Sequence, residues 1–393
     1  MNSLRPLNIS PFQSDLLDLS RWIAAFLVVA EHLRSLLYAD YEHQGGLGAL
    51  GKTFYFFTHF GHLAVMVFFV MSGFLVGGKV LERVVQGNFS WQKYGVDRIS
   101  RLYAVYLLAL LLGGALDSVG YHHFNEFGLY DKSFSGRIAV IEQNFHATLS
   151  LPIFAVNLVM CQTILGPVFG SNGPLWSLAN EFWYYLLGPF VFMLAFDKRT
   201  FWRILGIAGL IAIFWFLPAS ILIYAQVWLL GALLYFINGR GLVPLWVSLC
   251  LFGVCLTAAR LEWVKNPLIQ DFLTGISFAV VINSAAGVSR RLPGNNWSRK
   301  AAGFSYSVYL CHFPFLVFVV SLLFHMGAIG YPGLATFKLA SIYFMVLLTV
   351  LAWCYLISLA TERQTPRIRG WLNHGLARKP QVTGEPQIPP GKI

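Results

Sequence analysis

Long apolar segments recur along almost the whole of this 393-residue chain. About ten of them are long enough, or nearly so, to cross the roughly 30 Å hydrocarbon core of a bilayer as helices. They cover residues 19–38, 54–78, 102–118, 174–196, 201–217, 220–237, 243–258, 269–288, 302–326 and 336–360. With 57% hydrophobic and 11% charged residues, the chain has too little polar surface for a soluble protein. We therefore predict an all-α polytopic membrane protein with about ten transmembrane helices.

Basic residues gather in a few of the connections, and their positions predict the orientation in the membrane. These connections are 79–101, 198–203 and 290–300, together with the tail from residue 363 onward. Cytoplasmic loops carry an excess of Lys and Arg, so we place all four on the cytoplasmic side. Successive spans bring all four basic segments to the cytoplasmic side only if 119–173 makes no net crossing. Residues 138–160 are an eleventh candidate span, but polar residues interrupt it. Both termini are then cytoplasmic, and 119–173 is an outer loop.

Charge and cysteine usage exclude other classes of protein. The formal charge of +11 comes from short basic clusters between apolar segments, which is typical of topogenic loops and not of a nucleic-acid site. The five cysteines show no CxxC or metal-ligand spacing, so no metal site is predicted. Residues 1–365 are expected to form one transmembrane domain. Residues 366–393, where Pro, Gly, Gln and Lys become frequent, are expected to be a flexible cytoplasmic tail.

Three ionisable residues, Arg21, Glu31 and His32, lie on the first apolar segment. Arg21 and His32 are about three helical turns apart, which places both on one face, roughly 16 Å from each other. Ionisable groups are costly inside a bilayer and are usually kept for function, and an imidazole can take a proton near neutral pH. We therefore predict chemistry at His32. The alternatives are an interfacial anchor for Arg21 and an inter-helix hydrogen bond for His32.

Two more polar groups are candidates for binding. Arg98 and Arg101 are three positions apart at the cytoplasmic end of the third span, where two guanidiniums suit bidentate binding of phosphate. Plain positive-inside topology is the alternative for this pair. Glu181 lies about two turns into an apolar helix that opens at Pro174. It is expected to bind a sugar hydroxyl or to orient His32, and an inter-helix hydrogen bond explains it equally well.

Two segments remain open between packing and function. Tyr309 and His312 share a helix face at i, i+3, just before Pro314, and packing alone explains them. Ser72 and Gly73 lie in an aromatic segment, where small residues let helices approach closely, so packing is the default. A nucleophilic role for Ser72 is not favoured, because no base is paired with it in the sequence.

Taken together, these stretches resemble the membrane-bound acyltransferase 3 family, whose motifs occur here in the family's order over about 15–365. The matching stretches are Arg21 with His32, Phe68 to Leu75, Arg98 with Arg101, Trp176 to Glu181, Ser305 to Pro314, and Glu362 with Arg363. Two positions depart from the pattern. Ala104 stands where many members have Pro in the paired-arginine segment, and Met66 stands where many have an acidic residue.

The resemblance implies transfer of an acyl group, often acetyl, from cytoplasmic acyl-CoA to a hydroxyl of a carbohydrate or lipid-linked glycan. It implies a bacterial cytoplasmic (inner) membrane, acyl-CoA as co-substrate and no metal. Arg21, Arg98 and Arg101 are then expected to hold the CoA phosphates. His32 is expected to act as general base, or less favourably to accept the acyl group itself, with Glu31 or Glu181 orienting it. The expected substrate-binding residues are Trp176, Ser177, Tyr309 and His312, with help from the outer loop.

A different class also fits part of the sequence. A proton-coupled transporter or exporter of a sugar or hydrophobic substrate would use a buried His and Glu as proton relays. It explains the ionisable residues but not the paired arginines together with the other ordered motifs. A third alternative is an inactive relative that senses or scaffolds, and the presence of His32 argues against it.

Overall fold

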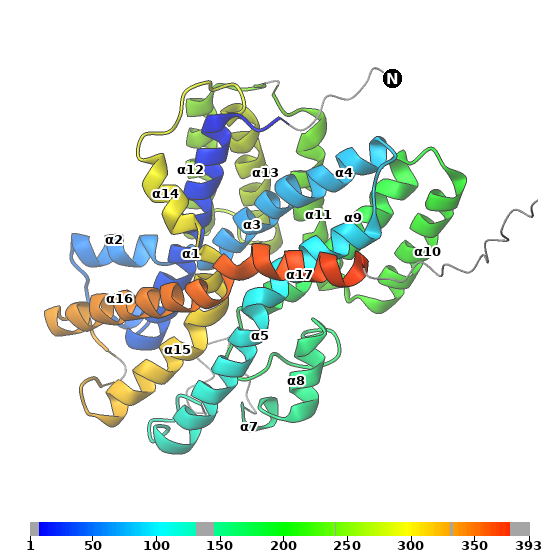
Figure 1. The fold of residues 1–393 in the computed structure, drawn as a ribbon. Helices are drawn as coiled ribbons and strands as arrows, with labels where there is room; N and C mark the ends of the chain where they lie inside the picture. The colour runs from blue at the N-terminus through cyan, green and yellow to red at the C-terminus, as the bar shows by residue number, and fades with distance from the viewer. Residues whose placement is uncertain (1–7, 131–144, 240, 331–332, 378–393) are drawn as a thin grey trace, which may run out of the picture.

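The computed structural model describes residues 8–130, 145–239, 241–330 and 333–377. Within these residues every helix or strand that can be assigned is a helix, and β-structure is limited to two isolated bridges. The helices pack as one bundle (Figure 1). The all-α prediction is confirmed for the described part of the chain.

A helix, or a run of helices, lies at each of the ten apolar segments. They are α1 (Pro11–Leu37), α2 (Ala49–Phe57) with α3 (Gly61–Ser72), η2 (Gly73–Gly77) and α4 (Gly78–Val85), α5 (Trp91–His123), α9 (Leu175–Phe196), α10 (Thr200–Phe216), α11 (Ala219–Leu233) with η3 (Leu234–Phe236), α12 (Leu245–Arg260), α13 (Pro267–Ala285), α15 (Ser305–His325) and α16 (Phe337–Ala360). Among the described helices, six are long and apolar enough to cross a membrane, and α10 and α12 are apolar but shorter. These six candidate spans support the prediction of a polytopic membrane protein, and the number of crossings stays a prediction.

The described part of 138–160 is broken into two short helices, α7 (Phe145–Thr148) and α8 (Leu151–Leu158). Eight residues of α-helix rise about 12 Å, far less than a bilayer needs. The following loop is tied to α5, because Asp117 accepts hydrogen bonds of 2.7 Å from both the backbone N–H and the hydroxyl of Ser171. These features favour an outer loop without a net crossing, although 131–144 lie outside the described residues.

The helix α3 passes through one π-helical turn, η2, where it meets α11 at very close range. A Cβ atom on Gly73 would collide with the carbonyl oxygen of Trp228, and one on Gly231 would collide with the carbonyl oxygen of Val70. Only glycine permits this approach of the two backbones. The packing interpretation of Gly73 is therefore confirmed.

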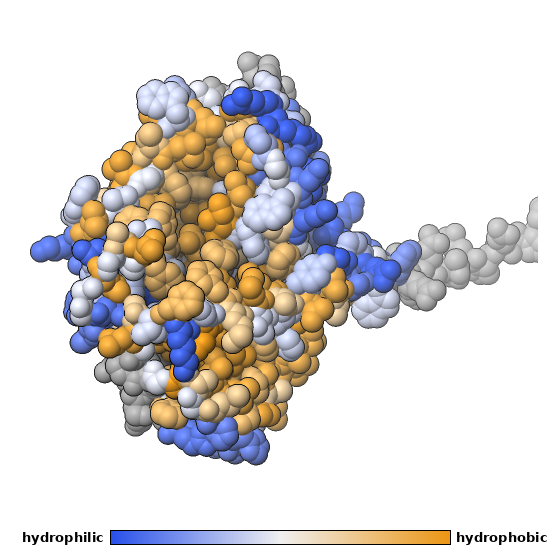
Figure 2. Space-filling model, turned by 90° about the vertical axis from the view of Figure 1, so that its left-hand side faces the viewer, coloured by the Kyte–Doolittle hydropathy of each residue, from blue (hydrophilic) through white to orange (hydrophobic). Residues whose placement is uncertain are grey.

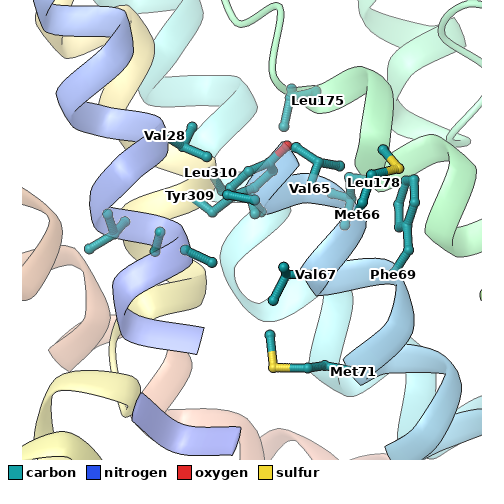
Figure 3. Close-up of a cluster of buried hydrophobic side chains, with 14 of the residues drawn as sticks. Val28, Val65, Met66, Val67, Phe69, Met71, Leu175, Leu178, Tyr309 and Leu310 are labelled. Atoms are coloured by element: carbon teal, nitrogen blue, oxygen red, sulfur yellow. The ribbon is translucent and has the colours of Figure 1, made fainter. Parts of the chain in front are cut away.

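The core around the middle of the bundle is built from α1, α3, α9 and α15. Val28, Val65, Phe69 and Leu178 are buried there with Leu310, and Figure 3 shows them as part of one cluster between these helices. Met66, which replaces a frequent acidic residue, is also fully buried. Its apolar side chain suits this position because an unpaired carboxylate would be costly there.

The segment that was expected to be a flexible tail begins with a helix. Flexibility was expected from residue 366 onward. The first of these residues instead lie in α17 (Thr365–Ala377), a helix that packs on α5 (Figure 1). Arg369 forms an ion pair of 3.1 Å with Asp97 of α5, and Ile368 and Leu372 are half-buried at i, i+4 spacing. Tertiary packing thus stabilises a segment whose composition alone suggests a tail. Residues 378–393 lie outside the described residues.

Candidate active site

Five stretches that lie far apart in the sequence line a single cavity. Its polar lining consists of Arg21 from α1, Ser72 from α3, Arg98 and Arg101 from α5, Ser177, Glu181 and Tyr185 from α9, and Ser305, Tyr306 and Tyr309 from α15. Apolar side chains of α3 and η2, including Phe68, Met71 and Leu75, complete the wall. The structure therefore brings together six of the ten predicted site residues.

Positive charge dominates this cavity. Three arginines line it, against one carboxylate, Glu181, among the described lining residues. The Arg98 guanidinium lies 5.5 Å from the ring centre of Tyr185, and its buried Nε has no hydrogen-bond partner among the described residues. A buried donor without a partner beside excess positive charge suits an anionic ligand.

The other two arginines have acidic partners. Arg101 forms an ion pair of 3.3 Å with Glu362, which also accepts hydrogen bonds from the backbone N–H and hydroxyl of Ser307. Arg21 lies 3.6 Å from Asp18, one turn earlier on α1. Arg98 is the arginine of the three that forms no ion pair among the described residues.

Glu181 is held by hydroxyl groups from two helices. Ser72 donates a hydrogen bond of 2.6 Å to its Oε1 atom, and Tyr185 donates to the same atom. The indole N–H of Trp228 donates to the Ser72 hydroxyl at 3.1 Å. The sequence analysis missed this polar role of Ser72, because the partner carboxylate lies 109 residues away and no local pattern announces the pair.

His32 is paired with His312 and not with a carboxylate. The Nδ1 atom of His32 lies 2.9 Å from the Nε2 atom of His312, and the ring planes differ by 4°. The ring centres are 5.2 Å apart, which is about the largest separation that this nitrogen distance allows, so the two rings meet edge to edge in one plane. This alignment is favourable for a hydrogen bond.

The backbone of α15 sets which nitrogens carry hydrogen. The Nδ1 atom of His312 lies 2.9 Å from the carbonyl oxygen of Val308 and 3.0 Å from that of Tyr309. A carbonyl oxygen only accepts, so this Nδ1 is the N–H and, in the neutral ring, Nε2 is an acceptor. His32 must then donate from Nδ1, which leaves its Nε2 as the basic nitrogen.

Tyr309 connects the histidine pair to the cavity. It lines the cavity one turn before His312, and its hydroxyl lies 2.5 Å from that of Ser177. Both hydroxyls also lie 3.2 Å from the carbonyl oxygen of Pro174, at the start of α9. The edge of Phe313 packs on the His32 ring at 4.9 Å. His32 is thus rigidly supported beside the cavity.

The remaining predicted residues, Glu31 and Trp176, lie elsewhere. The Glu31 carboxylate accepts the backbone N–H of Gly61 at the start of α3. The Trp176 ring packs face to face with His62, with centres 6.1 Å apart. Among the described residues, neither Glu31 nor Glu181 forms a hydrogen bond with His32, so His312 takes the orienting position that was expected for a carboxylate.

Fold and site together define a helical protein with candidate membrane spans and a cationic cavity beside a partly buried histidine pair. Residues 15–359 match the model of the acyltransferase domain family named acyltransferase 3, and the chain belongs to this family.

Two curated relatives match parts of the chain. An uncharacterised protein of Haemophilus influenzae is 30% identical over 157 residues, which cover 39% of this chain and 58% of that protein. Acyltransferase MdmB of Streptomyces mycarofaciens is 26% identical over 196 residues, which cover 48% of this chain and 42% of that protein. The chain thus spans about half the length of these relatives. No solved structure matches it.

Proposed function

We propose that this protein is an integral-membrane O-acyltransferase that moves an acyl group, taken here as acetyl, from cytoplasmic acyl-CoA to a hydroxyl of a carbohydrate or lipid-linked glycan. One observation carries the proposal: three arginines from α1 and α5 line the same cavity as Tyr309, one turn from the histidine pair. An anion-binding site and a base are the two groups that transfer from a CoA thioester to a hydroxyl requires.

The donor fits the chemistry of the cavity. Arg98, Arg101 and Arg21 would bind the CoA phosphates, with Arg98 Nε supplying a donor that has no other partner in the described residues. The apolar side chains of Phe68, Met71 and Leu75 would line the path of the pantetheine arm. Arg21 and His32 are about 16 Å apart along α1, so an extended arm is needed to join the phosphate site to the base.

His32 would act as the general base in a direct transfer. Its Nε2 takes the proton of the acceptor hydroxyl as the oxygen attacks the thioester carbonyl carbon. A C–O bond forms, the C–S bond breaks, and the CoA thiolate receives the proton back from the imidazolium. The products are an ester and free CoA. The hydrogen bond to His312 holds the ring in the required tautomer and stabilises the imidazolium.

The orientation belongs to the same proposal. Ten crossings with both termini in the cytoplasm would place the arginines at the cytoplasmic side and His32 deeper in the membrane. Donor and acceptor would then reach the site from opposite sides of a bacterial inner membrane. The roles of Glu181, Trp176 and Ser177 in holding the acceptor are part of this proposal.

Transfer of label from acetyl-CoA tests the proposal directly. Membranes containing the protein are incubated with [¹⁴C]acetyl-CoA, and label in acceptor material is compared with membranes containing His32→Ala. His43→Ala, a change at an exposed histidine outside the site, is the matched control. His32-dependent label is expected. Label that His32→Ala leaves unchanged would reject His32 as the base, and label no higher than in membranes without the protein would reject acyl transfer and favour the transporter class.

A further inference from the structure

A second cavity, of about 630 Å³, lies where α12 ends and where α3 and α13 begin. Two cationic side chains, Arg260 and Lys265, line it together with two carboxylates, Glu31 and Glu262. The Nε atom of Arg260 is buried and has no hydrogen-bond partner in the described part of the chain. A buried donor without a partner indicates a missing acceptor, and matched charges of both signs suit a zwitterionic ligand.

One wall of this cavity is held in place by a buried carboxylate. His62, which lines the cavity, lies 3.1 Å from the carboxylate of Asp271, whose exposed fraction is 1%. Asp271 also accepts a hydrogen bond of 3.0 Å from the hydroxyl of Tyr224. Because these contacts already fix His62, little further ordering is needed when a ligand binds.

An apolar groove continues from the cavity between α1, α3, α12 and α13. Its lining is almost wholly apolar and consists of Ser20, Ile23, Ala24, Leu27, Phe60, Leu63, Ala64, Val67, Phe252, Leu256 and Phe278. Phe60 and Leu63 line both the groove and the cavity, so the two are continuous. From Ser20 to Leu27 the groove follows α1 for about 10 Å, and Glu31 of the cavity lies one turn further on.

The exposed residues around these two spaces are those of a membrane interface. Trp263, which lies in sequence between Glu262 and Lys265, is 69% exposed, and tryptophan is typical of the headgroup level of a bilayer. Val254 of α12, on the helix that carries part of the groove, is exposed and apolar. Figure 2 views the molecule from the side of α12 and α14 and shows a largely hydrophobic surface that is hollowed in its middle. A lipid can therefore enter sideways, with its headgroup at the cavity.

Neither space is part of the candidate active site. Among the described residues, none that lines this cavity or this groove also lines the cavity of Arg21, Arg98 and Arg101, and His32 lines neither. A molecule bound here is therefore a ligand in its own right, separate from the acyl donor and the acceptor.

We propose that this site holds one bilayer phospholipid, phosphatidylethanolamine, as a bound structural lipid. Arg260 and Lys265 bind its phosphate, Glu31 and Glu262 bind its ammonium group, and one acyl chain fills the groove. Glu31 uses its Oε2 atom for the backbone N–H of Gly61, so its Oε1 atom is available to the ammonium group.

The charges of the cavity select this headgroup among common phospholipids. Phosphatidylglycerol has the phosphate but no cation, so it would place negative charge beside two carboxylates without a partner for them. Phosphatidylcholine has a quaternary ammonium group, which has no N–H to donate to Glu31 or Glu262. The inference does not depend on the proposed function, because it concerns a different site.

The lipid that stays bound to the purified full-length protein tests the proposal. Protein in a mild detergent is incubated with mixed micelles that contain equal amounts of phosphatidylethanolamine, phosphatidylglycerol and phosphatidylcholine. It is then purified again by size exclusion, and its lipid is measured by mass spectrometry. Phosphatidylethanolamine should be retained in preference to the other two. Equal retention of the three lipids, or preference for either of the others, would overturn the inference.

Arg260→Gln should lower the retention of phosphatidylethanolamine about tenfold, the order expected for one charge-assisted hydrogen bond. Arg203→Gln, at an exposed arginine of α10 outside the site, is the matched control and should retain the lipid as the wild type does. Elution in size exclusion shows whether each variant is folded, and Lys265→Gln takes the place of the first variant if it is not. Unchanged retention in the folded variant would overturn the phosphate assignment.

Glu262→Gln separates recognition of the headgroup from a general loss of structure. It removes one of the two carboxylates and leaves both cations, so the preference should shift from phosphatidylethanolamine toward phosphatidylglycerol. An unchanged preference would overturn the assignment of the ammonium group.

A groove variant tests the position of the acyl chain. Leu256→Trp fills the groove, so retention of phosphatidylethanolamine should fall about tenfold, as expected when two methylene groups lose their apolar contact. Val254→Trp, on the exposed face of the same helix, is the matched control and should stay within about twofold of wild type. Equal retention by a Leu256→Trp protein that elutes as the wild type does would overturn the groove assignment.

Discussion

The Nδ1 atom of His32 and the Nε2 atom of His312 face each other at 2.9 Å across the α1–α15 interface. Because His312 donates its own N–H to backbone carbonyl oxygens, the pair has one arrangement of hydrogens in its neutral form. Removing His312 would release the ring orientation and tautomer of His32 and leave the proposed base in place.

His312→Phe should therefore lower kcat by about tenfold or more while the KM for acyl-CoA changes little. His312→Gln should recover part of the loss, because its amide oxygen can accept the hydrogen bond from His32. The measurement is steady-state kinetics of both variants across pH. Equal activity of the Phe and wild-type proteins would rule out an orienting role, and equal loss in both variants would indicate packing alone.

His32→Ala should reduce transfer to below about one hundredth of wild type, because a general base contributes at least this factor. Membrane level and donor binding should stay nearly unchanged, since the proposed role of the imidazole is proton transfer and not folding or donor binding. Immunoblots, acyl-CoA binding and transfer assays on the same membranes provide the comparison. A normally accumulating variant with higher residual activity would show that the base lies elsewhere.

Arg98→Ala should weaken donor binding by about tenfold, the order expected for one charge-assisted hydrogen bond. Arg101→Ala should also weaken it, but this change leaves Glu362 without its ion pair and so combines binding with local destabilisation. Titration of acyl-CoA against each variant gives the affinities. Lys93→Ala, at an exposed position of α5, is the control for loss of basic charge on the same helix. Unchanged donor affinity in both arginine variants would leave membrane topology as their role.

Gly73→Ala should destabilise the protein strongly, because the new Cβ atom meets the backbone of α11. Gly95→Ala is the matched control, since nothing lies within 4 Å of a Cβ atom at that position in α5. There the substitution should be neutral or stabilise the helix by about 0.5–1 kcal/mol. Thermal unfolding of the purified proteins in detergent gives both values, and similar stability of the two variants would contradict the close approach.

Single cysteines in a background without the native five should report the topology. His123→Cys and Leu165→Cys, exposed on either side of α7 and α8, should react with a membrane-impermeant thiol reagent in intact cells. Gln86→Cys and Asn296→Cys, also exposed, should react only after lysis. Opposite labelling of positions 123 and 165 would show that 138–160 crosses the membrane. The two termini would then face opposite sides.

Much of the architecture was determined by local sequence. The length and composition of an apolar segment decide whether it forms a helix able to enter a bilayer, and both are properties of consecutive residues. For this reason, each of the ten apolar segments predicted from the sequence coincides with a helix or a run of helices in the structure. The spacing of Arg98 and Arg101, one turn apart, likewise predicted that they would act together, and both line the same cavity.

The tertiary structure alone decided which side chains meet. His32 and His312 are 280 residues apart, and Ser72 and Glu181 are 109 residues apart. In a helix hydrophobic on all sides, periodicity does not mark the face that turns inward, so the partner of a buried polar group follows only from packing. The same reason explains why Glu31, adjacent to His32 in sequence, turns to Gly61 on α3, and why α17 is ordered against α5. Sequence determined the helices and the chemical groups they carry, and long-range packing decided how those groups combine into a site.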